Sequence, residues 1–360
     1  MRRATQSMRR AQLMAARLHA PTRGPITVSS GRAIGGAYVS ARRLVTGASS
    51  RVKVEKQAGV VKVTLTRPDK MNALDMDMFR SLRDAARSLV DNPAGVRAVV
   101  LSGEGRAFCA GLDVRSVCHP LSATANMREL LHRPEGELSN LAQDVGYLWR
   151  RLPAPVIAAV HGICFGGGLQ IALGADIRVV APTCKLSVME AKWGLVPDMS
   201  ATVTLPELVP KDVAMELTMT GRVFDGREAL GLGLATKLSQ TPQEEALVLA
   251  QTIAQKSPDA TAAAKRLLHA TYSEASNDAR NLRLESELQT RLIGGWNQAA
   301  CAARGLGLPP FLRPSFKERA AQWSEEADSQ AELEIRAMLD GAVGDAPAAT
   351  GNAALASPSA

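Results

Sequence analysis

The chain has 360 residues, in which 43 lysines and arginines stand against 35 aspartates and glutamates, for a net charge of +8 and a pI near 9.5. The first 54 residues hold ten arginines, one lysine and no acidic residue. They carry +11, so the remainder carries −3, which argues against nucleic acid as a ligand of the main body. No apolar run reaches the roughly 20 residues of a membrane span.

Residues 1–50 have the composition of a targeting segment. They are rich in arginine, alanine and serine, lack acids and carry the pair Arg42-Arg43 near their end. This pattern is typical of an organellar transit peptide, and we expect import into the mitochondrial matrix, with a plastid as the second choice. The alternative is a disordered basic arm.

Metal and nucleotide motifs are missing from the sequence. The five cysteines are odd in number and show no Cys-x-x-Cys spacing, and the five histidines form no ligand pattern, so neither a disulfide framework nor a metal site is expected. Gly-x-Gly-x-x-Gly and P-loop motifs are also missing, so the sequence indicates no nucleotide cofactor bound in those ways.

The first elements after the leader follow the order β-β-α-β. Val52–Glu55 and Val60–Thr66 alternate around a turn at Ala58-Gly59 and predict a hairpin. Apolar residues at helical spacing predict a helix that starts at Asp75 and closes at residues 91–93, and Val96–Leu101 returns as a buried strand.

A second alternation predicts the rest of an α/β core over residues 51–250. Its elements are a strand at Val156–Val160, a helix at Gly167–Ala175, and strands at Ile177–Ala181 and Leu186–Val188.

The pattern becomes helical after residue 245. We expect a helical C-terminal region over 251–340, with helices at Ala260–Ala270, Asp278–Ile293 and, strongly charged, Phe316–Leu339. Such a region packs on the core or on a neighbouring subunit. Alanine, glycine, proline and serine dominate residues 341–360, which we expect to be disordered.

Two glycine turns carry the strongest chemical signal. Gly166, Gly167 and Gly168 stand between a strand and a helix, where backbone amides are free to bind negative charge. A second turn at 106–113 follows another strand. Two amides aimed at one point would form an oxyanion hole, although both turns could instead serve only helix packing.

Four motifs in order carry a resemblance to a known family. They are Arg67-Pro68-Asp69-Lys70-Met71-Asn72-Ala73-Leu74, Phe108-Cys109-Ala110-Gly111-Leu112-Asp113, His161-Gly162 through Gly168, and Ala175-Asp176-Ile177-Arg178. Over about residues 51–310 the chain resembles the crotonase family of enoyl-CoA hydratases and isomerases. The resemblance implies an α/β fold with a crotonase-like spiral of ββα units, a helical C-terminal trimerisation region, and acyl-CoA thioesters as substrates. Coenzyme A then belongs to the substrate, and no separate cofactor is expected.

The resemblance also implies which residues contact the thioester. The backbone amides of Leu112 and Gly167 would hold the enolate oxygen, and Asp113 would cap or orient the turn. Lys70 and Ala110 lie where relatives bind coenzyme A. A solvated lysine is an equal interpretation of Lys70.

The acid–base positions depart from the best-known hydratases. Those enzymes carry a glutamate where this chain has Gln170, and an amide cannot exchange a proton near neutral pH. The second acid remains as Glu190, and Asp198 follows eight residues later, as in the dienoyl-CoA isomerase branch. That branch has an aspartate where this chain has Gln170, so two of its three carboxylates match. Alternatively Glu190 pairs with Lys192 or an arginine, Asp198 is a turn residue, and Gln170 binds a neighbour.

Three kinds of function follow from these residues. Double-bond isomerisation of enoyl-CoA in fatty-acid β-oxidation is the first, because Glu190 alone or with Asp198 suffices to move a proton. Hydration of enoyl-CoA or hydrolysis of the thioester is the second. A non-catalytic protein that binds coenzyme A or RNA is the third.

Overall fold

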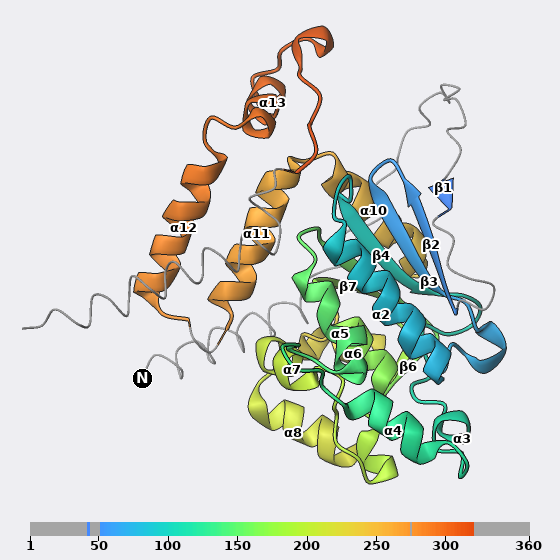
Figure 1. The fold of residues 1–360 in the computed structure, drawn as a ribbon. Helices are drawn as coiled ribbons and strands as arrows, with labels where there is room; N and C mark the ends of the chain where they lie inside the picture. The colour runs from blue at the N-terminus through green and yellow to red at the C-terminus, as the bar shows by residue number, and fades with distance from the viewer. Residues whose placement is uncertain (1–41, 44–50, 274–275, 320–360) are drawn as a thin grey trace, which may run out of the picture. The chain divides into compact units, whose positions relative to one another are not determined.

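The computed structural model describes residues 42–43, 51–273 and 276–319 (Figure 1). The expected transit peptide lies outside the described residues except for Arg42–Arg43, and so does the expected tail from residue 341. Of the charged helix expected over Phe316–Leu339 only residues 316–319 are described, and they are not helical. Within the described residues, no helix is both long enough and apolar enough to cross a membrane.

Seven strands form the larger sheet in the order β1-β2-β3-β4-β5-β7-β10. The bounds are Arg42–Arg43 (β1), Val52–Gln57 (β2), Val60–Leu65 (β3), Ala98–Gly103 (β4), Val156–Val160 (β5), Ile177–Val180 (β7) and Lys237–Leu238 (β10). The pairs β1-β2 and β2-β3 are antiparallel, and all later neighbours are parallel. Every residue of β4 and β5 is buried, as expected for central parallel strands covered on both faces.

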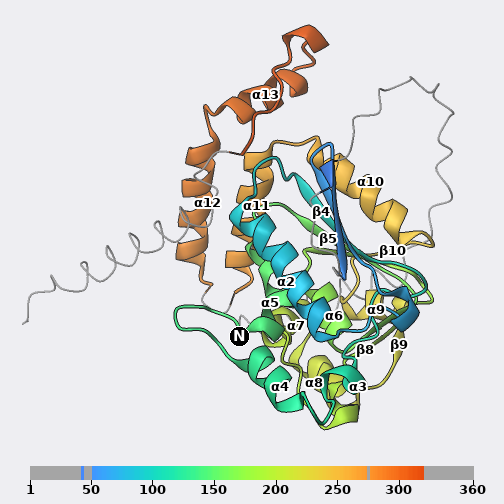
Figure 2. The same ribbon diagram turned by 45° about the vertical axis from the view of Figure 1, so that its right-hand side comes forward.

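Helices cover both faces of this sheet (Figures 1 and 2). Successive side chains of β4 point to opposite faces of the sheet, and each face has its own hydrophobic cluster. Val99 and Leu101 belong to one cluster, while Ala98 and Val100 belong to the other. The first cluster includes residues of α2 (Met76–Asp91) and α5 (Leu141–Arg151). The second includes residues of α10 (Pro242–Ala254), which packs across β3, β4, β5 and β7.

A smaller sheet orders three strands as β6-β8-β9, with bounds Ile163–Phe165, Lys185–Ser187 and Phe224–Asp225. The chain visits the two sheets in turn. From β5 in the large sheet it enters β6 in the small one and then helix α6 (Gly167–Leu173), and from β7 it enters β8 and then the 3₁₀ turn η2 (Glu190–Trp193). This repeated strand–strand–helix path confirms the predicted spiral of ββα units.

The predicted hairpin, the helix capped by Asp75 and the strands of the core are confirmed to within about two residues. The helices between them were not predicted from the sequence, and they are α3 (Val114–Val117), α4 (Ala123–Leu131), α7 (Ala201–Leu208), α8 (Lys211–Thr220), α9 (Gly226–Leu232) and α5. Several are short, and tertiary packing rather than a strong apolar period specifies them.

Helices α11 (Pro258–Thr271), α12 (Asp278–Leu292) and α13 (Trp296–Gly305) confirm the helical C-terminal region. A buried polar network fastens α11 to the core. The Lys265 ammonium lies 2.8 Å from an Asp176 carboxylate oxygen and donates to the carbonyls of Trp149 and Ala154 at 2.8 and 3.2 Å, and His269 contacts the other Asp176 oxygen at 2.8 Å. Burial opposes ionisation, but the neighbouring Lys265 and His269 hold the pKa of Asp176 below its usual value.

We expect Lys265→Met to destabilise the fold. The substitution leaves a buried carboxylate and two buried carbonyls without their cation, which costs about 3–5 kcal/mol. Chemical denaturation measures the free energy of unfolding. Lys237→Met is the matched control, since Lys237 forms an exposed pair with Glu245, and its loss costs at most about 1 kcal/mol. Equal effects of the two substitutions would contradict the assignment.

Candidate active site

The two glycine turns come together through their backbones. The turn after β4 forms an isolated parallel bridge, Cys109 with Cys164, against β6. The amide of Cys109 donates to the carbonyl of Ile163 at 3.1 Å, and the amide of Phe165 donates to the carbonyl of Cys109 at 3.1 Å. Segments that lie more than fifty residues apart in sequence thereby become neighbours.

Glycine is required where the two backbones approach most closely. A Cβ on Gly168 would lie 2.4 Å from the carbonyl oxygen of Cys109, closer than real Cβ contacts. A Cβ on Gly111, whose φ is +88°, would lie 2.7 Å from the carbonyl oxygen of Phe165 and 3.7 Å from the amide nitrogen of Gly167. The side-chain-free surfaces of both turns therefore face one another at the start of α6.

The amides of Leu112 and Gly167 are free to bind a ligand. The carbonyl of Gly111 accepts from Leu74 at 2.8 Å and the amide of Asp113 donates to Leu74 at 3.0 Å, so the intervening amide of Leu112 faces the other way. Gly167 is the first residue of α6, where an amide has no partner inside the helix. Neither amide donates to a protein acceptor among the described residues.

Glu190 lies beside the start of α6 and is buried. A Cβ on Gly166 would lie 3.5 Å from Oε1 of Glu190, which places the carboxylate next to the start of α6. Burial is the largest cause that raises the pKa of Glu190, and the charge of Asp198 adds to it. Within the described chain, Oε2 of Glu190 is shielded from water and has no hydrogen-bond partner. No ion pair joins Glu190 to Lys192 or to a described arginine, so a structural salt bridge does not account for this carboxylate.

Gln170 holds Glu190 and the following loop at once. Its side-chain nitrogen donates to Oε1 of Glu190 at 2.6 Å, and its side-chain oxygen accepts from the amides of Met199 and Ala201 at 2.8 and 3.3 Å. Because the oxygen already accepts two amide hydrogens, the amide group is fixed with its nitrogen toward the glutamate. Gln170 is 2% exposed, so these contacts are made away from bulk water.

Asp198 stands apart from Glu190. Its side chain is exposed to solvent, yet nearby protein atoms desolvate it enough to raise its pKa. No hydrogen bond joins the two acids in the described chain, and they act on one another through electrostatic repulsion. The structure brings together Leu112, Gly167, Gln170 and Glu190, with Asp198 at the edge of the group.

Lys70 and Ala110 lie on neighbouring loops. Lys70 is exposed at the end of the 3₁₀ turn η1 (Pro68–Lys70). The residue after it, Met71, accepts a hydrogen bond at its carbonyl from the amide of Ala110 at 2.9 Å. The loop after β3 therefore runs alongside the turn that presents Leu112.

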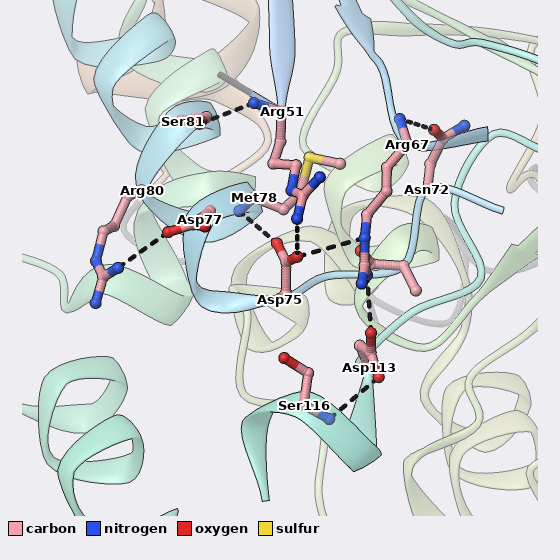
Figure 3. Close-up of polar contacts among 11 residues, drawn as sticks. Arg51, Arg67, Asn72, Asp75, Asp77, Met78, Arg80, Ser81, Asp113 and Ser116 are labelled. Carbon is pink, nitrogen blue, oxygen red and sulfur yellow. Dashed lines mark hydrogen bonds and ion pairs between the residues drawn. The ribbon is translucent and has the colours of Figure 1, made fainter. Parts of the chain in front are cut away.

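Two groups of contacts were not predicted from the sequence. Met199 is buried, and its sulfur would lie 2.6 Å from a Cβ on Gly167, so it forms an apolar wall beside that amide; nothing in the sequence signals this contact. The second group is the cluster of Arg67, Asp75 and Asp113 (Figure 3), in which Nη1 of Arg67 contacts Asp113 at 2.8 Å and Nε contacts Asp75 at 3.3 Å. Opposite charges in two of the family motifs were its only signal. Asp113 caps α3 as expected, by accepting from the amide of Ser116 at 3.2 Å.

The thiols next to the site are unsuited to nucleophilic chemistry. Burial raises the pKa of Cys109 to about 12 and also raises that of Cys164, so both stay protonated at neutral pH. The described residues contain no group of three or more histidine, cysteine, aspartate or glutamate side chains placed to hold a metal ion. The chemistry that the described groups offer is stabilisation of an oxyanion and proton transfer by a carboxylate.

Comparison with known proteins agrees with this chemistry. The family model described as enoyl-CoA hydratase/isomerase matches residues 55–297. The chain is 33% identical over 228 residues to the enoyl-CoA hydratase EchA19 of Mycobacterium tuberculosis, covering 63% of this chain and 83% of that protein. It is 32% identical over 226 residues to a peroxisomal Delta(3,5)-Delta(2,4)-dienoyl-CoA isomerase of Arabidopsis thaliana, covering 60% and 80%.

Solved structures give the same result for the fold. The crystal structure of an enoyl-CoA hydratase from Bacillus anthracis matches with a TM-score of 0.64 at 25% identity, covering 74% of this chain and 99% of that one. An enoyl-CoA hydratase from Polaromonas sp. JS666 matches with a TM-score of 0.62 at 27% identity, with the same coverage. The fold and the matched family model are those of an acyl-CoA-processing enzyme family. The chain belongs to the enoyl-CoA hydratase/isomerase, or crotonase, family.

We expect Gly168→Ala to destabilise the protein. Alanine normally stabilises a helix by about 0.5–1 kcal/mol relative to glycine, but here its Cβ would press on the Cys109 carbonyl and cost about 1–3 kcal/mol. Gly305→Ala in α13 is the control, because a Cβ there meets nothing within 4 Å. Urea denaturation should show loss for the first variant and no loss for the second. A stabilised Gly168→Ala would contradict the close approach of the turns.

Proposed function

We propose that the chain is an enoyl-CoA isomerase that moves a carbon–carbon double bond through a thioester enolate, as a step of fatty-acid β-oxidation. The observation that carries the proposal is the arrangement at Gln170. Its amide replaces the first acid of a two-carboxylate site and is fully occupied in holding Glu190 and the 199–201 loop. Among the described residues, Glu190 is left as the buried carboxylate at the start of α6, where the amide of Gly167 has no protein acceptor.

The proposed reaction needs a proton to be taken from one carbon and returned to another. Ionised Glu190 removes a proton from C2 of a 3-enoyl-CoA through Oε2, the oxygen that Gln170 leaves free. The electron pair moves onto the thioester oxygen, where the amides of Leu112 and Gly167 donate to it. Each such preorganised donor supplies about 3–4 kcal/mol. Protonated Glu190 then returns the proton to C4, which gives the 2-enoyl-CoA with no net change in atoms.

A single carboxylate suits this cycle because the same group serves first as base and then as acid. Because the pKa of Glu190 is raised toward neutral pH, the difference in free energy between its ionised and protonated forms is smaller, and the carboxylate reaches both forms during the reaction. Asp198 is the second acid of the proposal. It transfers the second proton in substrates, such as dienoyl-CoA, whose deprotonated and reprotonated carbons are too far apart for one carboxylate to reach both. No group beyond the coenzyme A of the substrate is required.

Hydration of enoyl-CoA is the alternative that the relatives favour, since EchA19 and both structures named above are hydratases. Hydration needs a base that activates water and an acid that protonates carbon at the same time. Glu190 would have to supply one of these groups, and Asp198 would have to supply the other in place of the acid that Gln170 replaces. Mass distinguishes the reactions, because hydration adds one water and hydrolysis releases coenzyme A, whereas isomerisation adds no atoms and only exchanges hydrogen for deuterium in heavy water. Binding of coenzyme A or RNA without turnover would support a non-catalytic role.

Location and assembly form part of the proposal. The acid-free, arginine-rich residues 1–50 support import into the mitochondrial matrix, and a fluorescent fusion of this segment that stays in the cytosol would contradict it. Leu282, Ile293 and Trp296 on and between α12 and α13 are 61%, 65% and 50% exposed, which supports contact with further copies in a trimer or a dimer of trimers. Light scattering that gives a monomer would contradict this assembly.

We expect Glu190→Gln to lower the isomerisation rate by about 10² to 10⁴-fold, the usual contribution of a general base. The test follows deuterium uptake and bond position in 3-enoyl- and 3,5-dienoyl-CoA by mass and ultraviolet spectra in heavy water. The wild-type kcat/KM should rise with pH through the raised pKa of Glu190 and level off above it, because the base must be ionised.

Stability separates this loss from misfolding. A buried carboxylate with a raised pKa stabilises the fold less as pH rises through that value, since the folded state holds its proton more tightly than the unfolded chain does. Glu190→Gln should therefore unfold at an equal or higher temperature at pH 7. Glu244→Gln, an exposed residue in the first turn of α10, is the control and should keep full activity. An active Glu190→Gln would overturn the proposal.

A further inference from the structure

We propose that Arg67 is a positioning residue for the oxyanion hole. Arg67 sets the direction of the Leu112 amide, because its side chain ties the turn that contains Leu112 to the loop after β3. The inference rests on the proposed function for its kinetic consequence. It rests on Figure 3 for its geometry, in which the Arg67 side chain reaches from the end of β3 toward both Asp75 and Asp113.

The contacts of Arg67 converge on the turn from one side. Nη1 lies 2.8 Å from Oδ2 of Asp113 and donates to the carbonyl of Ala73 at 3.0 Å, while Nε lies 3.3 Å from Oδ2 of Asp75. Arg51 contacts the same oxygen of Asp75 at 3.0 Å. The side chains of Arg67, Asp75 and Asp113 are only 10%, 8% and 17% exposed, so water screens these charges weakly.

Asp113 is the residue next to the donor. Its Oδ1 accepts from the amide of Ser116 and its Oδ2 from Arg67, so the carboxylate is held at both oxygens. Its amide donates to Leu74, whose own amide donates to Gly111. Leu112 is thus fixed on both sides, and its amide direction depends on contacts that Arg67 closes.

The loop that Arg67 closes is itself tightly built. The Arg67 amide donates to the side-chain oxygen of Asn72 at 2.8 Å, and the Asn72 side-chain nitrogen donates to the carbonyl of Ala107 at 2.8 Å, inside the Leu112 turn. Asn72 is fully buried with a φ of +54°, a conformation that persists only where surrounding contacts enforce it. Arg67 therefore acts on the turn through two routes, one by side chain and one by backbone.

A misplaced donor weakens enolate binding more than substrate binding, because charge develops on the oxygen only in the reaction. We expect Arg67→Ala to lower kcat for double-bond movement by about 10- to 100-fold with KM changed less than about 3-fold, since a displacement of about 1 Å costs up to 10²-fold. Arg67→Lys keeps the charge but not the fork that reaches two carboxylates, so it should recover only part of the rate.

Two further variants make the test sharp. Asp113→Asn keeps an oxygen for the Ser116 amide and so keeps the cap, but removes the charge that faces Arg67, and it should reproduce the loss of kcat. If Arg67→Ala does not fold, Asp113→Asn still tests whether the contact between Arg67 and Asp113 supports kcat. Arg80→Ala is the matched control, because Arg80 pairs with Asp77 and Glu129 on the surface and should leave kcat unchanged.

Hydrogen exchange supplies a readout that needs no turnover. Peptides that contain the amides of Ala110 and Asp113, which donate to Met71 and Leu74, should exchange faster in Arg67→Ala and Asp113→Asn than in wild type or Arg80→Ala. If the wild-type protein shows no turnover, the proposed function is overturned. The hydrogen-exchange rates of these peptides then decide by themselves whether Arg67 positions the turn. Unchanged kcat and unchanged exchange in the folded Arg67 and Asp113 variants would overturn the positioning role.

Discussion

The apposition of two glycine turns is the constraint on which the site depends. Cys109 and Cys164 pair through their backbones, and a Cβ on Gly168 would come within 2.4 Å of the Cys109 carbonyl. Only chains without side chains at these points can approach so closely, and the approach brings the turn that contains Leu112 to the start of α6, where Gly167 lies. The amides of both residues lack a protein acceptor among the described residues, so an oxyanion can bind them without breaking a hydrogen bond of the fold.

The two halves of the site are held by polar side chains that lie one layer behind the reacting groups. Gln170 fixes Glu190 and the 199–201 loop, and Arg67 fixes the turn of Leu112. In each case one planar group makes contacts to two segments at once. Buried polar groups that are satisfied in this way specify one arrangement of the loops rather than adding much net stability.

Much of the scaffold is readable from the sequence. The alternation around Ala58-Gly59, the cap at Asp75 and the apolar run at Val156–Val160 each encode a local preference that the fold keeps. The glycine motifs likewise indicate two turns with uncovered backbone amides, and the family resemblance assigns the donors within them to Leu112 and Gly167. The short helices between Val188 and residue 242 have no comparable local signal, since packing against the core decides them.

The contacts that orient the site were not readable in this way. That Glu190 faces Gln170 instead of Lys192 depends on how η2 meets the start of α6, which joins residues twenty positions apart through tertiary packing. The separation of Asp198 from Glu190 has the same origin, because a spacing of eight residues across a loop sets no direction for either side chain. Arg67 stands in one of the family motifs, yet its partner Asp113 lies 46 residues away, and sequence alone gives no distance between them.

The replacement of an acid by Gln170 changes what the neighbouring glutamate is able to do. A second carboxylate 2.6 Å from Oε1 would share a proton with Glu190 and couple their titrations, whereas the amide donates a hydrogen bond and stays neutral. Burial then raises the pKa of Glu190 and the charge of Asp198 adds to that rise, while the Gln170 hydrogen bond opposes it. A lone carboxylate of this kind, with one oxygen held and the other unpartnered, is suited to carrying one proton between two carbons. It is less suited to adding a water, which requires a base for the water and an acid for the carbon at the same moment.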